Sequence, residues 1–208
     1  MQGVFITFEG PDGSGKTTQI NFLTDYLVKK GFNVLNTREP GGTDISEKIR
    51  SIILDPDNSE MDDMTEALLY AAARAQHVSQ LIKPALEKGT IVISDRFMDS
   101  SIVYQGFARG LGDCVRVINE YAVQGVQPDL TFFMNLSAED GIARAEKRQK
   151  LDRLEQESID FHKSVYEGYL KISEYYKDRY VNIDASLSVD DVFAQIRTAF
   201  EDYFANRA

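Results

Sequence analysis

The chain has 208 residues, of which 43% are hydrophobic and 27% charged, proportions that fit one soluble globular domain. Its 33 acidic residues outnumber its 23 lysines and arginines, and the net charge of −10 argues against an extended basic surface for nucleic acid or an anionic membrane. The single cysteine, Cys114, excludes an intramolecular disulfide, and neither a signal peptide nor a membrane span is recognisable, so we expect a cytoplasmic protein.

Five short apolar runs are predicted to form parallel strands. Each run is hydrophobic on both faces instead of alternating, which is typical of strands buried between two layers of helices. Alternation of these runs with helical patterns predicts an α/β fold, an open sheet with helices on both faces. The expected strands are 4–9, 33–38, 90–95, 130–136 and 180–184.

The helical patterns carry recognisable end signals. The first helix should end at Gly31, and in the long helix that follows residue 64 we expect Pro84 to kink or break the last turn. Asp113 and Ser188 are the expected N-caps of two later helices. The polar stretch 147–158 predicts a mobile flap.

A phosphate-binding loop is the most specific signal in the chain. Residues 10–17, "GPDGSGKT", match G-x-x-x-x-G-K-[ST] between a predicted strand and a predicted helix. Lys16 should reach the β- and γ-phosphates of ATP, and the Thr17 hydroxyl should ligate Mg²⁺, with Asp95 as a second ligand, directly or through water. The expected cofactor-binding residues are Gly10, Pro11, Asp12, Gly13, Ser14, Gly15, Lys16, Thr17 and Thr18.

Arginines recur in short strings at predicted strand ends and helix faces, as an anionic second substrate would require. These strings are "TREPGG" (37–42), "YAAAR" (70–74), "DRF" (95–97), "SSIVYQGFARG" (100–110) and "LDRLEQE" (151–157). Together with the phosphate loop, and in this order over nearly the whole chain, they resemble the thymidylate kinase family, P-loop enzymes that phosphorylate dTMP with ATP and Mg²⁺.

The resemblance implies a single P-loop kinase domain over residues 1–208, with strand order 2-3-1-4-5, a mobile lid at 144–157 and a homodimer. It places Arg38 and Arg96 at the dTMP phosphate, with Glu39 beside them, and Asp12 at the sugar 3′-OH. Simpler alternatives stay open for three positions: Arg50 as a solvated helix residue, Ser100 as a turn residue and Tyr104 as plain core. The implied substrate-binding residues are Asp12, Arg38, Glu39, Arg50, Tyr70, Arg74, Arg96, Ser100, Ser101, Tyr104 and Gln105.

The transferred phosphoryl group needs positive charge in the transition state. Some thymidylate kinases supply an arginine from the phosphate loop, but this chain has Gly13 at that position. The lid is the other source, with Arg153 as the first candidate, Arg148 the second and Lys150 the third, or these residues form only a solvated basic helix end. The expected catalytic residues are Lys16, Arg96, Arg153, Asp12 and Arg148.

Two other functions compete with this interpretation. A deoxynucleoside kinase would share the chemistry, but it would not need Arg38 and Arg96 for an acceptor phosphate. A P-loop switch ATPase that binds a partner protein would leave "TREPGG" and "SSIVYQG" without a role.

Overall fold

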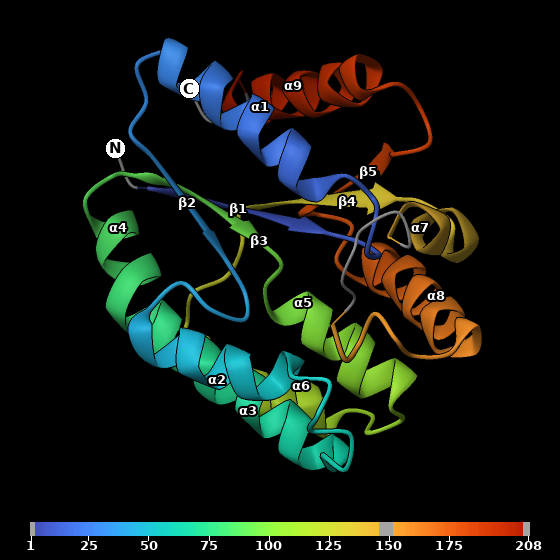
Figure 1. Ribbon diagram of the computed structural model, residues 1–208. Coiled ribbons are helices and arrows are strands. Elements are labelled where there is room, and N and C mark those ends of the chain that lie inside the picture. Colours follow the sequence, from blue (N-terminus) through green and yellow to red (C-terminus); the bar gives the residue numbers. More distant parts are fainter. Residues whose placement is uncertain (1–2, 146–151, 206–208) are drawn as a thin grey trace.

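Five parallel strands form one sheet in the order β2-β3-β1-β4-β5 in the computed structural model, which describes residues 3–145 and 152–205 (Figure 1). All the predicted strands and their order are confirmed, with each boundary within one residue of the expectation. The strands are β1 (Val4–Glu9), β2 (Val34–Arg38), β3 (Ile91–Asp95), β4 (Leu130–Asn135) and β5 (Tyr180–Asp184).

Helices cover both faces of the sheet, as predicted. In Figure 1, α1 and α9 lie above the sheet, whereas α3, α6 and α8 lie below it. The α-helices are α1 (Lys16–Lys29), α2 (Asp44–Leu54), α3 (Asp63–His77), α4 (Lys83–Glu87), α5 (Met98–Ser101), α6 (Cys114–Ala122), α7 (Ala138–Ala145), α8 (Ile159–Tyr175) and α9 (Val189–Ala205), and two π-helical segments are η1 (Val78–Ile82) and η2 (Ile102–Ala108).

The core is built from aliphatic and aromatic side chains on both sides of the sheet. Above it, Leu23 of α1 and Ile196 of α9 pack with Phe8 of β1 in one apolar cluster. Below it, Tyr169 of α8 stacks on Phe133 of β4 with 5.5 Å between the ring centroids. Burial of large side chains on both faces fixes the sheet firmly between its helices.

Most of the predicted helix ends are confirmed. Gly31 follows α1 with a φ of 88°, and the Ser188 hydroxyl accepts a hydrogen bond from the Asp191 amide at 3.2 Å. The long helix is interrupted by the π-helical segment η1 just before Pro84, which lies in the first turn of α4. Asp113 stands at the N-cap of α6 as predicted, but its carboxylate pairs with Arg116 and accepts no hydrogen bond from an amide of the helix.

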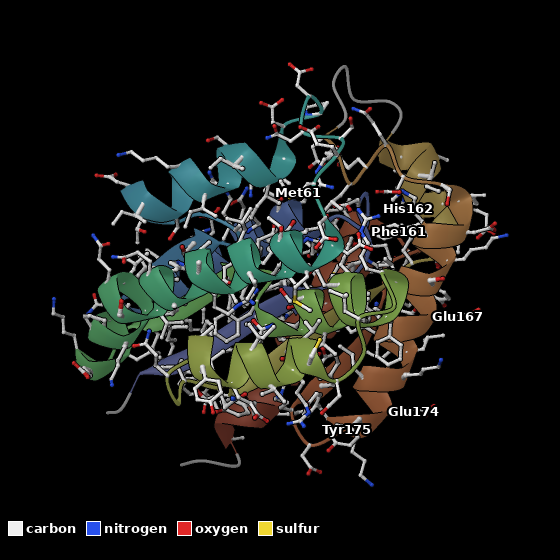
Figure 2. The ribbon with its side chains drawn as sticks, turned by 90° about the horizontal axis from the view of Figure 1, so that it is seen from below. Met61, Phe161, His162, Glu167, Glu174 and Tyr175 are labelled. Carbon is white, nitrogen blue, oxygen red and sulfur yellow. The ribbon has the colours of Figure 1, made fainter. Side chains whose placement is uncertain are left out.

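The outer side of α8 faces solvent. Figure 2 shows Glu167, Glu174 and Tyr175 along this side and Phe161 and His162 at the beginning of the helix, where both are buried.

Within residues 3–145 and 152–205, no helix is both long enough and apolar enough to cross a membrane.

Candidate active site

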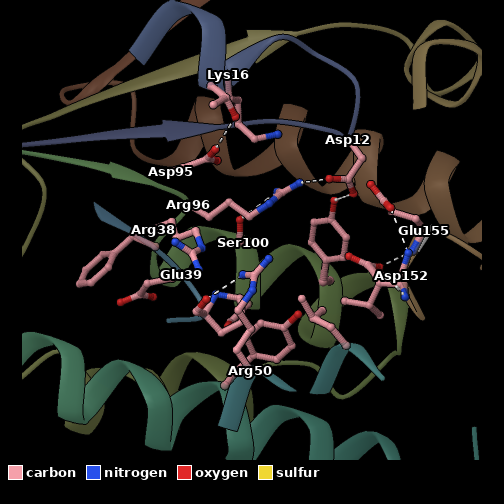
Figure 3. A pocket seen from close by; sticks show the side chains of 18 of the residues that line it. Asp12, Lys16, Arg38, Glu39, Arg50, Asp95, Arg96, Ser100, Asp152 and Glu155 are labelled. Atoms are coloured by element: carbon pink, nitrogen blue, oxygen red, sulfur yellow. Dashed lines mark hydrogen bonds and ion pairs between the residues drawn. The ribbon is translucent and has the colours of Figure 1, made fainter. Parts of the chain in front are cut away.

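A cavity of about 510 Å³ opens at the carboxyl ends of the central strands. The register places Phe8 of β1 and Arg38 of β2 opposite Asp95 of β3, so the segments that follow these strands begin side by side. Ligands of open α/β sheets bind at this edge. All the residues that the sequence indicated for dTMP line the cavity, as do Lys16, Thr17 and Asp95 (Figure 3).

The phosphate loop has the conformation that its glycines predict. Gly10, Gly13 and Gly15 have φ values of 139°, 78° and 88°, a region that other residues rarely adopt. Gly15 stands at the N-cap of α1 and offers the first amides of the helix no side-chain acceptor. These N–H groups and the helix dipole therefore form a ready site for phosphate oxygens.

Lys16 lies inside this loop. Its Nζ donates to the carbonyl oxygens of Gly10 at 3.1 Å and Pro11 at 2.8 Å. Burial, together with the nearby Arg96 charge, lowers the pKa of Lys16 to about 8, although Asp95 and Asp12 act in the opposite direction. A polyphosphate beside Lys16 would favour its charged form.

The two expected metal ligands are in contact. The Thr17 hydroxyl donates to Asp95 Oδ2 at 3.2 Å, and both side chains line the cavity. A hydroxyl and a carboxylate are oxygen donors of the kind that Mg²⁺ takes from proteins, its other ligands being water and phosphate oxygens. Thr17 and Asp95 therefore fit a magnesium ion bound between the loop and β3.

Arg96 connects the phosphate loop to the arginine-lined part of the cavity. It has a φ of 69°, an unusual backbone conformation for an arginine and one that occurs at functional sites. Its Nη2 pairs with Asp12 Oδ1 at 2.7 Å, while the Tyr104 hydroxyl donates to Asp12 Oδ2 at 3.1 Å. Burial alone would raise the pKa of Asp12, but the charges of Arg96 and Lys16 lower it well below its usual range.

Behind Arg96 lies a buried acid that sequence analysis did not single out. Glu9 accepts hydrogen bonds from the Phe97 amide at 2.8 Å, Ser100 Oγ at 2.6 Å and the Tyr169 hydroxyl at 2.9 Å. Tyr169 also accepts a hydrogen bond from Arg96 Nη1 at 2.9 Å. Ser100 Oγ accepts a hydrogen bond from Arg96 Nη1 at 3.2 Å and Tyr104 bonds Asp12, so both side chains contact the Arg96–Asp12 pair, although Tyr104 also belongs to the apolar core.

Arg38 is the last residue of β2, and His77 supports the end of this strand and the loop that follows it. Arg38 is half exposed and pairs with Glu47 at 3.0 Å. His77 is fully buried, with Nδ1 2.9 Å from Glu39 Oε1 and Nε2 2.6 Å from Thr37 Oγ1. No spacing in the sequence indicated that His77 supports this loop, because its partners lie about 40 residues away.

Arg74 lies at the back of the cavity with most of its donors occupied. Its Nε bonds Glu39 at 2.6 Å, its Nη1 bonds Ser101 and Asn119, and its Nη2 bonds the Phe97 carbonyl oxygen at 3.0 Å. This arginine thus ties the loop after β2 to α5 and α6. The neighbouring Arg50 donates to the Pro40 carbonyl oxygen at 2.7 Å.

The arginines and the lysine of the segment that the sequence predicted as a lid differ in where the structure places them. Arg153 lies outside the cavity lining: its Nε donates to the Ile53 carbonyl oxygen at 2.8 Å and its Nη2 pairs with Glu66 at 2.5 Å. Arg148 and Lys150 lie outside the described residues. Arg144, at the end of α7, lines the cavity, and its Nη1 donates to the Ala185 carbonyl oxygen at 3.2 Å. Sequence analysis placed Arg144 in the lid but gave it no role.

A phosphate loop and an arginine-lined pocket that open into one cavity, on a parallel sheet of order 2-3-1-4-5, define a P-loop nucleoside monophosphate kinase. The family model described as "Thymidylate kinase" matches residues 8–196. The chain belongs to the thymidylate kinase family, the phosphotransferases that convert dTMP to dTDP with ATP.

Known relatives agree over the full length. The chain is 53% identical to the thymidylate kinase of Geobacillus sp. (strain WCH70), with 100% of both chains covered. It is 52% identical to that of Lactobacillus helveticus (strain DPC 4571), with 97% of each covered. A crystal structure of thymidylate kinase from Ehrlichia chaffeensis superimposes with a TM-score of 0.78 at 31% identity, covering 96% of this chain and 99% of that one.

Proposed function

We propose that the described cavity binds ATP and dTMP together and that phosphoryl transfer runs between the phosphate loop and Arg96. The observation that carries this assignment is the 2.7 Å ion pair between Asp12, in the phosphate loop, and Arg96, in the arginine-lined pocket. This pair makes the donor and acceptor sites contiguous. A loop that only hydrolysed ATP would not need such a neighbour.

The donor side is assigned to the phosphate loop. The loop amides and Lys16 hold the β- and γ-phosphates, which replace the loop carbonyls as partners of Nζ. Thr17 and Asp95 would hold Mg²⁺, which when bound neutralises charge on the bridging phosphates. Among the described residues, no group of three or more His, Cys, Asp and Glu side chains is placed to hold a metal. A two-residue site completed by phosphates and water is therefore the arrangement that suits this chain.

The acceptor side is assigned to three arginines and Asp12. Arg38, Arg50 and Arg96 all line the cavity and together balance the dTMP phosphate dianion. Burial, with Arg38 close by, lowers the pKa of Arg50, and a bound dianion would offset that effect. One carboxylate oxygen of Asp12 lies beside Tyr104, and Asp12 is assigned to the sugar hydroxyl. The residues assigned to the surroundings of the base are Tyr70, Arg74, Ser101 and Gln105.

The charge that stabilises the moving phosphoryl group is assigned to Arg144. Unlike Arg153, Arg144 lines the cavity, and its Cβ lies 3.2 Å from where a Cβ on Gly13 would stand. Arg153 would first have to leave Glu66 and Ile53. We propose that Arg153 instead holds the lid against α2 and α3, and that Arg148, outside the described residues, assists Arg144.

Two further expectations belong to this proposal. The family resemblance implies a homodimer, with residues 64–82 and 113–124 as candidate interface segments. It also implies a cytoplasmic location. Size-exclusion chromatography with light scattering measures the first, and a mass near twice the 23.5 kDa of the chain is the expected result.

The proposal is tested by ADP release with ATP and Mg²⁺ in the presence of dTMP, dUMP, dCMP, dGMP, thymidine or no acceptor. We expect the fastest release with dTMP, almost none without an acceptor, and loss of activity when EDTA removes Mg²⁺. Fast release with thymidine would identify a deoxynucleoside kinase. Release that does not depend on any acceptor would identify an ATPase and contradict the assigned pocket.

A further inference from the structure

We propose that Glu66 determines which pyrimidine base the cavity accepts, because it fixes the orientation of the Gln105 side-chain amide. This inference rests on the proposed function and names a residue that acts through Gln105 without touching the substrate. Glu66 is therefore a positioning residue. The structural basis is a hydrogen bond between two buried side chains and a buried oxygen atom that has no partner.

The two side chains meet at the wall of the cavity. Gln105 Nε2 donates to Glu66 Oε1 at 2.9 Å, and Gln105 is 1% exposed while Glu66 is fully buried. Gln105 lines the cavity, and its Oε1 is buried without a hydrogen-bond partner among residues 3–145 and 152–205. A buried acceptor without a partner is costly, so this oxygen is suited to a donor supplied by a ligand.

The amide of Gln105 cannot turn over while Glu66 is ionised. A carboxylate only accepts hydrogen bonds, so the NH₂ group of the amide must face it, and the amide oxygen must face away. Arg109 Nη2 lies 3.2 Å and Arg153 Nη2 lies 2.5 Å from Glu66 Oε2. Burial alone would raise the pKa of Glu66, but the hydrogen bonds from Gln105, Arg153 and Arg109 lower it, which keeps the carboxylate charged.

This orientation distinguishes pyrimidines by the hydrogen on ring nitrogen N3. Thymine and uracil carry N3–H, which can donate to Gln105 Oε1. Cytosine has a lone pair at N3, so two acceptors would face each other in a buried place, and sites built for a hydrogen bond reject analogues that lack it. The 5-methyl group does not enter this contact, so Glu66 should not distinguish dTMP from dUMP.

The test compares kcat/KM for dTMP, dCMP and dUMP in the whole enzyme and in Glu66→Gln. The new side chain can accept a hydrogen bond from Gln105 or donate one to it, so the Gln105 amide becomes free to turn its NH₂ group toward the base. We expect the dTMP-to-dCMP ratio of kcat/KM to fall by about tenfold or more, while the dTMP-to-dUMP ratio stays unchanged. Arg74 remains beside the base, so some preference should persist.

Asp63→Asn is the matched control. Asp63 lies on the same helix as Glu66, and its carboxylate is 3.3 Å from Arg109, which Glu66 also contacts. The hydrogen bond of the Gln105 amide, however, is made with Glu66. We expect the control to keep the wild-type dTMP-to-dCMP ratio. An equal fall in both variants would mean that any lost negative charge near Arg109 produces the effect, and it would overturn the inference.

A double variant covers the case in which Glu66→Gln does not fold. Exchanging the two side chains, Glu66→Gln with Gln105→Glu, keeps the number of charges beside Arg109 and Arg153 and again presents an acceptor to the cavity. We expect this variant to retain the preference for dTMP over dCMP. Loss of the preference in the double variant, or an unchanged ratio in a folded Glu66→Gln, overturns the inference. If the wild-type enzyme itself fails to phosphorylate dTMP, the proposed function fails instead.

Discussion

Gly13 of the phosphate loop and Gly141 of α7 are in backbone contact. A Cβ placed on Gly13 would lie 2.3 Å from the Gly141 carbonyl oxygen, and a Cβ on Gly141 would lie 2.6 Å from the Asp12 carbonyl oxygen. The absence of a side chain at both positions lets α7 approach the loop. This approach brings Arg144 to the cavity and leaves no space for a side chain at position 13.

Gly141→Ala should therefore be destabilising although alanine usually favours a helix. The added methyl group would overlap with the phosphate loop, and we expect a loss of about 1–3 kcal/mol in the free energy of unfolding and a higher KM for ATP. Urea denaturation and ATP titration measure both quantities. Ala143→Ser, at an exposed position of the same helix, should change neither; equal effects in the two variants would contradict the packing argument.

Arg144→Ala should lower kcat by about 10³-fold if Arg144 supplies the charge on the transferred phosphoryl group. Arg153→Ala should lower kcat less, within about tenfold, and should mainly destabilise the lid, because Arg153 pairs with Glu66. Steady-state kinetics and thermal unfolding of both variants separate the two roles. The reverse order of the kcat effects would show that Arg153 leaves Glu66 when the nucleotides bind.

Glu9→Gln should change how stability depends on pH. Burial, with the negative charge of Asp99 adding to it, raises the pKa of Glu9 from 4.5 to about 7. The folded pKa lies above the unfolded one, so the native state binds more protons than the unfolded state between these two values. The stabilisation of the folded protein that comes from the protonated Glu9 is therefore complete below pH 4.5 and is lost as the pH rises through 7. The ionised buried carboxylate then costs about 3 kcal/mol.

The variant lacks this cost, so its advantage over the wild type should be small at pH 5 and grow toward pH 8. Urea denaturation at both pH values measures the difference in unfolding free energy. A difference that stays constant with pH would mean that Glu9 titrates near its ordinary value. We expect both proteins to be active, because a glutamine at position 9 can still form hydrogen bonds with Ser100 and Tyr169 and the Arg96–Asp12 pair should therefore stay in place.

His77→Ala should raise the KM for dTMP more than the KM for ATP. The imidazole contacts Thr37, near the end of β2, and Glu39, in the loop that follows, so it holds the chain on both sides of Arg38, and its loss would leave the buried Glu39 without this partner. We expect a loss of about 2–3 kcal/mol in the free energy of unfolding. His162→Ala is the control, because His162 is also buried but its Nε2 has no partner in the described ranges. Equal KM shifts for both nucleotides would argue for a general folding defect.

The sequence by itself determined the sheet, the phosphate loop and most of the residues that line the pocket. Buried parallel strands are continuous apolar runs, so their positions can be recognised locally, and the phosphate loop needs glycines and a lysine at fixed spacing. Several of the residues that line the cavity lie at or directly after the carboxyl ends of β1, β2 and β3, and therefore within short motifs. Arg38 and Arg96 were found for this reason.

Only the tertiary structure decided how these residues are supported. Glu9, Glu66, His77 and Tyr169 act through partners up to 160 residues away, and no local pattern records which side chains will face each other across a packed core. The roles of the lid arginines depend in the same way on packing: Arg153 has its partners on α2 and α3, whereas Arg144 reaches the cavity because two glycines let α7 lie against the phosphate loop.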